Sequence, residues 1–185
     1  MILSIINIKL PEDYFVFNKD PDYAMSQRAL NDWKQISEFI QWGRRNPVLF
    51  CEEIFGIEFL DYQKYVFMNT WTTPYNVWCC GRSSGKTTLG AIYLMAKTLL
   101  VPNHKSYILC GVGSQSIEMF TKIEQIATNA IPSFKSLTDV FLGELVKSQA
   151  NTNGFSHDPA SHKCGVYNNS QIFTLNGSFD NNRSK

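Results

Sequence analysis

The spacing of hydrophobic and polar positions changes near residue 74. Before it, apolar residues recur every three or four positions, which predicts amphipathic helices over 26–41, over 47–56 and from about residue 61. A proline opens the second of these segments and a glycine closes it, as is typical of helix boundaries. Residues 1–24, which two prolines interrupt, are predicted to form an irregular arm ahead of a helical lead-in over 25–73.

After residue 74, short apolar runs alternate with amphipathic segments. Residues 75–80 (YNVWCC) and 105–113 (KSYILCGVG) have the length and composition of buried strands. Residues 86–100 and 114–131 have helical periodicity. The order strand, loop, helix, strand, helix predicts an α/β domain over 74–185, with a parallel sheet flanked by helices.

The stretch from residue 132 to about residue 164 is polar and predicts no regular element. Two short β-prone runs follow it, over 165–169 and 170–178. The asparagine pair between them favours a turn, so these runs are compatible with a hairpin.

Composition limits the class of protein more than its function. A chain of 185 residues with 44% hydrophobic and 14% aromatic residues can bury a sizeable core. The net charge of +1 gives no strong basic field, so contact with nucleic acid would depend on local patches or on assembly into a ring. The apolar start MILSIINIKL is too short to cross a bilayer and lacks the basic flank of a signal peptide.

The five cysteines lie mostly in apolar runs, where a reduced thiol packs as a small hydrophobic group. This pattern predicts a reducing, cytosolic compartment, with Cys79 and Cys80 buried. Four potential metal ligands lie in one short stretch: His157, Asp158, His162 and Cys164. Their spacing does not match the two close pairs of a four-ligand zinc site, so a polar loop is favoured over a metal site.

Gly85, Lys86 and Thr87 lie between a predicted strand and a predicted helix, which is the setting of a phosphate-binding loop. In such loops backbone N–H groups surround phosphate oxygens, the lysine reaches the β- and γ-phosphates, and the hydroxyl binds Mg²⁺. Cys80 takes the place of the first glycine of the common motif. Arg82 adds a second cation, a candidate arginine finger supplied in cis, with a solvated loop arginine as the alternative.

The run Gly81-Arg82-Ser83-Ser84-Gly85-Lys86-Thr87 resembles the deviant phosphate loop of the large subunits of tailed-bacteriophage terminases, which reads small-Arg-x-x-Gly-Lys-Ser/Thr. The resemblance implies a P-loop NTPase fold of the ASCE type that binds ATP and Mg²⁺. It assigns catalytic roles to Arg82 and Lys86 and a Mg²⁺ contact to Thr87. The nucleotide-binding residues implied are Gly81, Ser83, Ser84, Gly85, Lys86, Thr87 and Thr88.

Three other stretches are similar to the same family. The segment 46–63 ends in Tyr62-Gln63, which the resemblance places on the adenine side of the nucleotide, although a surface glutamine is the simpler alternative. Residues 111–123 look like the family's Ser-Gln turn and the helix after it. Residues 172–185 look like the segment that leads to its second nucleotide motif, except that Arg183-Ser184 replaces the usual Arg-Gly.

ATP hydrolysis in this class needs an aspartate for Mg²⁺ and a glutamate that orients the attacking water. The acidic residues after Lys86 do not end an apolar β-run in the sequence: Glu118, Glu124, Asp139, Glu144, Asp158 and Asp180. The sequence therefore predicts an incomplete ATPase domain, truncated before its acidic strand. We expect it to bind nucleotide with little or no turnover, which leaves its status as an enzyme open.

The resemblance implies the ATP-binding part of a viral motor that moves double-stranded DNA into procapsids. Double-stranded DNA, the small terminase subunit, the portal protein and further copies in a ring are the implied partners, and no membrane is expected. The implied location is the host bacterial cytoplasm, transiently at the procapsid portal. Another helicase-like P-loop ATPase and a truncated fragment that binds nucleotide without hydrolysis are the alternatives.

Overall fold

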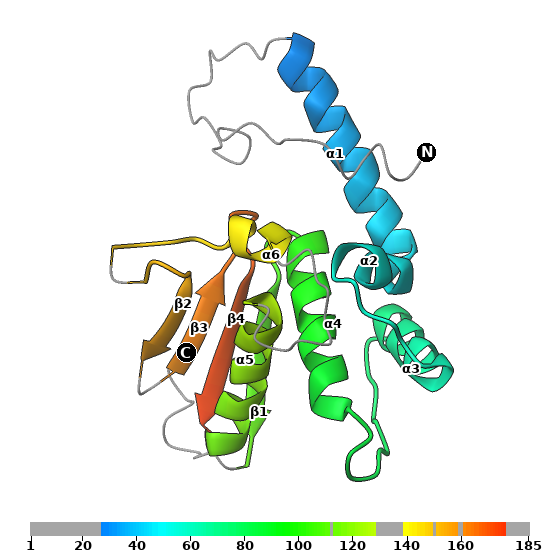
Figure 1. Cartoon of the computed structure of the whole chain (residues 1–185), viewed down its shortest axis with the longest axis vertical. Coiled ribbons are helices and arrows are strands. Elements are labelled where there is room, and N and C mark those ends of the chain that lie inside the picture. The colour runs from blue at the N-terminus through cyan, green and yellow to red at the C-terminus, as the bar shows by residue number, and fades with distance from the viewer. Residues whose placement is uncertain (1–26, 112, 129–138, 150, 159–160, 177–185) are drawn as a thin grey trace.

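The computed structural model describes residues 27–111, 113–128, 139–149, 151–158 and 161–176. These residues form a mixed α/β fold with one four-stranded sheet flanked by helices (Figure 1). The helices are α1 (Gln27–Arg45), α2 (Pro47–Ile54), α3 (Asp61–Thr72), α4 (Lys86–Leu100), α5 (Gly113–Ala127) and α6 (Asp139–Glu144). The strands are β1 (Lys105–Cys110), β2 (Phe155–Asp158), β3 (Ser161–Gly165) and β4 (Gln171–Asn176).

The three helices predicted for the lead-in are confirmed. α2 begins at Pro47, which occupies the first helical position, and Gly56 follows its end with a left-handed φ of 62°. α1 continues beyond its predicted end to Arg45 and projects from the rest of the molecule (Figure 1). The predicted arm over 1–24 lies outside the described residues.

The sheet has the strand order β1-β4-β3-β2 and is mixed. β1 and β4 are parallel, whereas β4, β3 and β2 are successively antiparallel. The predicted parallel sheet is thus found only in the β1–β4 pair of the described residues. The predicted hairpin is confirmed in part, because β3 and β4 are antiparallel and joined by a turn in which Asn169 has a φ of 65°. Its first strand was placed too late in the sequence, since β3 ends at Gly165, where the predicted run 165–169 begins.

The prediction that residues 132–164 hold no regular element is wrong. They contain α6, β2 and nearly all of β3. Each of the two strands has a single buried residue, Phe155 in β2 and Cys164 in β3. The alternation of apolar and polar residues that marks a strand is therefore too weak to read from the sequence.

The strand predicted over residues 75–80 does not form. This segment has no regular secondary structure, and Tyr75 and Val77 are 93% and 89% exposed. Two side chains attach the segment to α3 and its C-cap residue. The indole N–H of Trp78 donates to the hydroxyl of Thr70 at 2.8 Å, and the side-chain amide of Asn76 donates to the carbonyl of Thr73 at 2.9 Å. A β-prone sequence becomes a strand only when it pairs with another, and none of the described strands pairs with this segment.

The sheet buries one face against α4 and α5. Along β1, Ser106 and Ile108 are buried, while Tyr107 and Leu109 are exposed on the opposite face. The Tyr107 ring stacks on Phe173 of β4 with a centroid distance of 5.5 Å. The hydrophobic core therefore lies between this sheet and the helices, with the phosphate-loop candidate at one end of α4.

The carboxyl end of α4 is fixed by residues far away in the sequence. The side-chain amide of Asn168 donates to the carbonyl oxygens of Thr98 and Leu99, at 2.8 and 3.1 Å. Arg44 Nε donates to the carbonyl of Leu100 at 2.5 Å. These bonds satisfy carbonyl groups that the last turn of a helix leaves without partners. α4 is thus held in place at the end opposite the loop.

Glu144 at the end of α6 is largely buried, and burial raises the pKa of its carboxyl to about 7 from an ordinary 4.5. The folded protein therefore holds this proton more tightly than the unfolded chain, so its stability falls as pH rises through this interval. We expect Glu144→Gln to stabilise the protein near pH 8 and to have much less effect near pH 4.5. Urea denaturation at both pH values checks this, with the exposed Glu118→Gln as the control for loss of a charge. An equal effect of Glu144→Gln at both pH values would contradict it.

Candidate functional site

The loop Gly81–Gly85 connects the extended segment 75–80 to α4 and forms an exposed tip of the molecule (Figure 1). α4 begins at Lys86, and Gly85 is its N-cap residue. α4 forms because Leu89, Ile92 and Met95 recur at helical spacing and are buried. Its positive N-terminal end therefore lies at the loop, where an anion is stabilised.

The backbone of the loop has two left-handed residues. Ser83 has a φ of 61° and Gly85 a φ of 74°, with Ser84 between them. Glycine adopts such a conformation without strain, but serine does so at a cost of about 1–2 kcal/mol. Loops that mix right- and left-handed residues turn successive N–H groups toward one point and so bind anions. The conformation is compatible with a phosphate cradle.

The side chains of the loop converge on one carbonyl group. Lys86 Nζ lies 3.4 Å from the carbonyl oxygen of Gly81, and the Ser84 hydroxyl donates to the same oxygen at 3.0 Å. The lysine therefore folds back over the loop that precedes it. An ammonium group in this position can bind the oxygens of a phosphate that enters the loop.

Thr87 and Thr88 lie in the first turn of α4 and are half-buried. The Thr87 hydroxyl would hold Mg²⁺ together with nucleotide phosphates, since Mg²⁺ prefers oxygen ligands and often takes most of them from phosphates and water. Within the described part of the chain, no cluster of three or more His, Cys, Asp or Glu residues can hold a metal.

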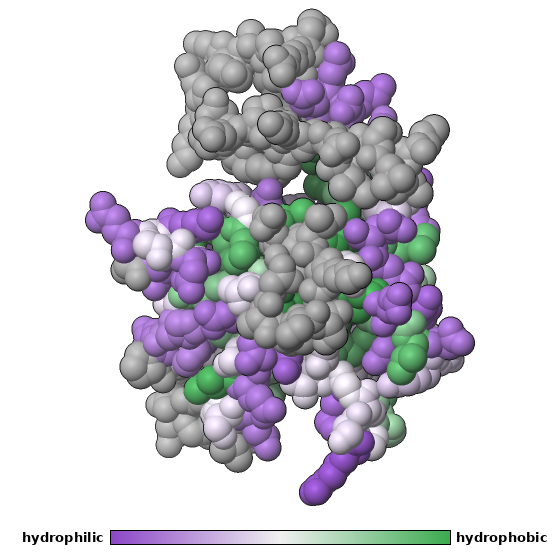
Figure 2. Space-filling model, in the orientation of Figure 1, coloured by the Kyte–Doolittle hydropathy of each residue, from purple (hydrophilic) through white to green (hydrophobic). Residues whose placement is uncertain are grey.

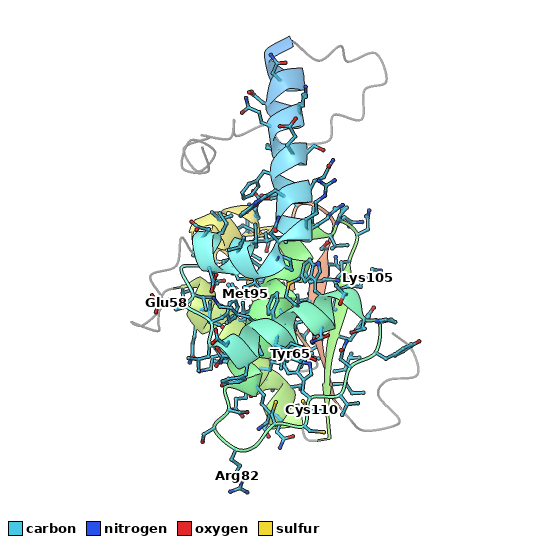
Figure 3. The ribbon with its side chains drawn as sticks, turned by 90° about the vertical axis from the view of Figure 1, so that its right-hand side faces the viewer. Glu58, Tyr65, Arg82, Met95, Lys105 and Cys110 are labelled. Atoms are coloured by element: carbon cyan, nitrogen blue, oxygen red, sulfur yellow. The ribbon has the colours of Figure 1, made fainter. Side chains whose placement is uncertain are left out.

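Arg82 is exposed, and its side chain extends away from the fold at the tip of the loop (Figure 3). Figure 2 shows that this tip is hydrophilic. Arg82 thus lies within the loop but directs its guanidinium into solvent, whereas Lys86 folds back onto the loop.

The N-terminal end of α3 contacts the loop. The Tyr62 hydroxyl donates to the carbonyl oxygen of Ser84 at 3.1 Å, and Gln63 Nε2 lies 3.4 Å from the Tyr62 hydroxyl. Gln63 is also adjacent to Gly85, where an added Cβ would lie 3.4 Å from its Nε2. The structure thus brings the Tyr-Gln pair together with the loop that follows it by about 20 residues in the sequence.

α3 is held against α4 by an aromatic cluster. Phe67 is fully buried and contacts the rings of Phe59, Trp71 and Tyr93 at centroid distances of 5.4, 6.2 and 5.6 Å. Lys97 of α4 lies over the Trp71 ring, 4.4 Å from its centroid. This packing fixes the helix that carries Tyr62 relative to the helix that begins at the loop.

The stretch with His157 and His162 forms the β2–β3 hairpin, and the predicted polar loop is wrong. The two histidine rings are 5.1 Å apart, and His157 Nε2 lies 3.3 Å from a carboxylate oxygen of Glu124 on α5. Burial and the neighbouring His157 lower the pKa of His162. Cys164 is buried with a raised pKa that favours the thiol. These contacts attach the hairpin to α5.

The cysteines are free, but the prediction that Cys79 and Cys80 are buried is wrong. Cys79 is exposed and Cys80 is half-buried, because the segment that carries them is not part of the sheet. Cys51 and Cys164 are buried.

Comparisons with known proteins identify no family for this chain. No protein-family model matches the sequence, and no curated protein is significantly similar to it. Among the described residues, no helix is both long and apolar enough to span a membrane.

Proposed function

We propose that this chain binds ATP, with Mg²⁺, at the loop Gly81–Gly85 and the first turn of α4. The observation that carries the proposal is the contact of Tyr62 with Ser84, in a loop whose Gly81 carbonyl is contacted by Lys86. Backbone N–H groups of Gly81, Ser83, Ser84 and Gly85 would surround the phosphates, and Lys86 would neutralise them. Thr87 would contact Mg²⁺, with Thr88 beside it.

We further propose that the ATP site belongs to a P-loop NTPase domain of the ASCE type, in the large subunit of a phage terminase. The support is the loop motif, its position before an apolar helix and the Tyr-Gln pair against it. The whole motor would couple ATP hydrolysis to the movement of double-stranded DNA through the portal, with the small subunit and further copies in a ring. It would act in the host cytoplasm and at the procapsid portal.

The proposed site provides for binding more clearly than for hydrolysis. Among the described residues, Lys86 forms no ion pair with an Asp or Glu side chain, and strands β1 and β4 end at Cys110 and Asn176. We therefore propose a chain that binds ATP and turns it over slowly. Phosphate release from the purified chain measures this, and a Lys86-dependent rate in the ordinary range of ATPases would contradict it.

The binding proposal is tested with Lys86→Ala. Removing a charge-assisted contact to phosphate is expected to weaken ATP binding by about 10- to 100-fold. Titration calorimetry with MgATP measures the dissociation constant. Lys105→Ala is the matched control, since Lys105 is an exposed lysine on β1, far from Arg82 and the tip of the loop (Figure 3).

The control protein is expected to bind MgATP as the wild type does. Equal affinities of the wild type and Lys86→Ala would show that ATP binds elsewhere. Failure of the folded wild type to bind MgATP would overturn the proposed function.

A further inference from the structure

A chain of three hydrogen bonds leads from the start of α3 to the phosphate-loop candidate, and the last of them reaches the loop. The backbone N–H of Leu60 donates to Gln63 Oε1 at 3.0 Å, and Gln63 Nε2 donates to the Tyr62 hydroxyl at 3.4 Å. The Tyr62 hydroxyl in turn donates to the carbonyl oxygen of Ser84 at 3.1 Å. We name these residues, Leu60, Tyr62, Gln63 and Ser84, the α3–loop relay.

We propose that Tyr62 is a positioning residue for the phosphate loop, which acts through the Ser84 carbonyl and not through the base of the nucleotide. This inference rests on the proposed ATP site and specifies how that site is kept in shape. Gln63 supports Tyr62 by orienting its hydroxyl.

The hydrogen-bonding capacity of the two side chains supports this assignment. A tyrosine hydroxyl has one proton, and here it is donated to Ser84, so the oxygen is left to accept from Gln63. Gln63 Oε1 accepts from Leu60 as a glutamine at the third helical position does in a capping box. To pair with adenine, Gln63 would need its side-chain carbonyl and amide groups. Each of these groups already forms one hydrogen bond within the protein.

Ser84 is the residue through which the loop can be held. Its carbonyl accepts from Tyr62, and its hydroxyl donates to Gly81, so it is bound on two sides. It also lies between the left-handed residues Ser83 and Gly85. Because the serine at position 83 is strained in this conformation, the loop needs contacts from outside to keep it.

The relay is attached to a fixed part of the fold. α3 carries Tyr62, and the buried Phe67 packs the same helix against Tyr93 of α4, the helix that begins at the loop. The distance between the Tyr62 backbone and the loop is therefore set by the packing of two helices. A hydroxyl placed in this way restricts the loop before any ligand binds, which reduces the ordering cost of binding.

The test compares MgATP with inorganic tripolyphosphate, which has the phosphates without the base or the sugar. Tyr62→Phe removes the hydroxyl and keeps the ring. If Tyr62 positions the loop, the variant is expected to bind both ligands about three- to tenfold more weakly, by the same factor. Tyr65→Phe is the matched control, because Tyr65 is on the same helix and is 72% exposed. Thermal unfolding shows whether each variant is folded.

Each result decides one of the two proposals. A loss confined to MgATP would mean that Tyr62 reads the base, and unchanged binding of both ligands would mean that its hydroxyl does not hold the loop. Either outcome overturns the positioning role and leaves the ATP site intact. If the wild type binds neither ligand, the proposed function fails and the positioning role fails with it.

Discussion

Replacing Phe67 by alanine is expected to lower the free energy of unfolding by about 3–5 kcal/mol, the usual cost of removing a buried phenylalanine. The Phe67 side chain has no exposed surface, and its ring contacts Phe59, Trp71 and Tyr93. The three surrounding rings belong to different segments and cannot all close the cavity. Urea denaturation, followed by tryptophan fluorescence, measures the change.

Tyr65→Ala is the control for Phe67→Ala. Tyr65 lies two residues away on the same helix and is 72% exposed, so its loss is expected to change stability by less than about 0.5 kcal/mol. Because Phe67 holds α3 against α4, its loss should also loosen the α3–loop relay and weaken binding of MgATP to the folded fraction. A change in stability below about 1 kcal/mol would show that α3 does not pack on α4 as described.

Replacing Gly154 by alanine is expected to destabilise the protein by about 3 kcal/mol, through two separate effects. Gly154 has a φ of 84°, a left-handed conformation that disfavours a side chain. A Cβ added there would lie 2.6 Å from Cβ of Leu145, a fully buried residue that follows α6 directly. The Leu145 Cβ cannot rotate away as the end of a side chain could, so the backbone itself must shift.

Gly143→Ala is the matched control for Gly154→Ala. Gly143 is in α6, close to Leu145 in the sequence, and an added Cβ would meet no atom within 4 Å. Alanine is the better helix former, so this variant is expected to be neutral or slightly more stable, by less than about 1 kcal/mol. Thermal or urea unfolding of both variants measures the difference in stability. Equal stabilities would contradict the packing of the turn before β2 against Leu145.

The helices and the loop motif could be predicted from the sequence because each depends on residues close together in the chain. α4 has apolar residues at helical spacing and a glycine before its first turn. In α5, which the helical periodicity of 114–131 predicted, Phe120, Ile123 and Ala127 lie at helical spacing and are buried. The first contact of the relay is local as well, since Gln63 caps the helix in which it lies.

The contacts between distant segments were decided only by the tertiary structure. A strand needs a partner, so the apolar run at 75–80 stays exposed, while polar residues 161–165 join a sheet because β4 lies beside them. The same holds for the site. The sequence alone placed Gly85, Lys86 and Thr87 where the loop meets the helix, from local turn and helix chemistry. Only the packing of Phe67 between α3 and α4 brought the Tyr62 hydroxyl to Ser84, because that contact depends on the distance between two helices.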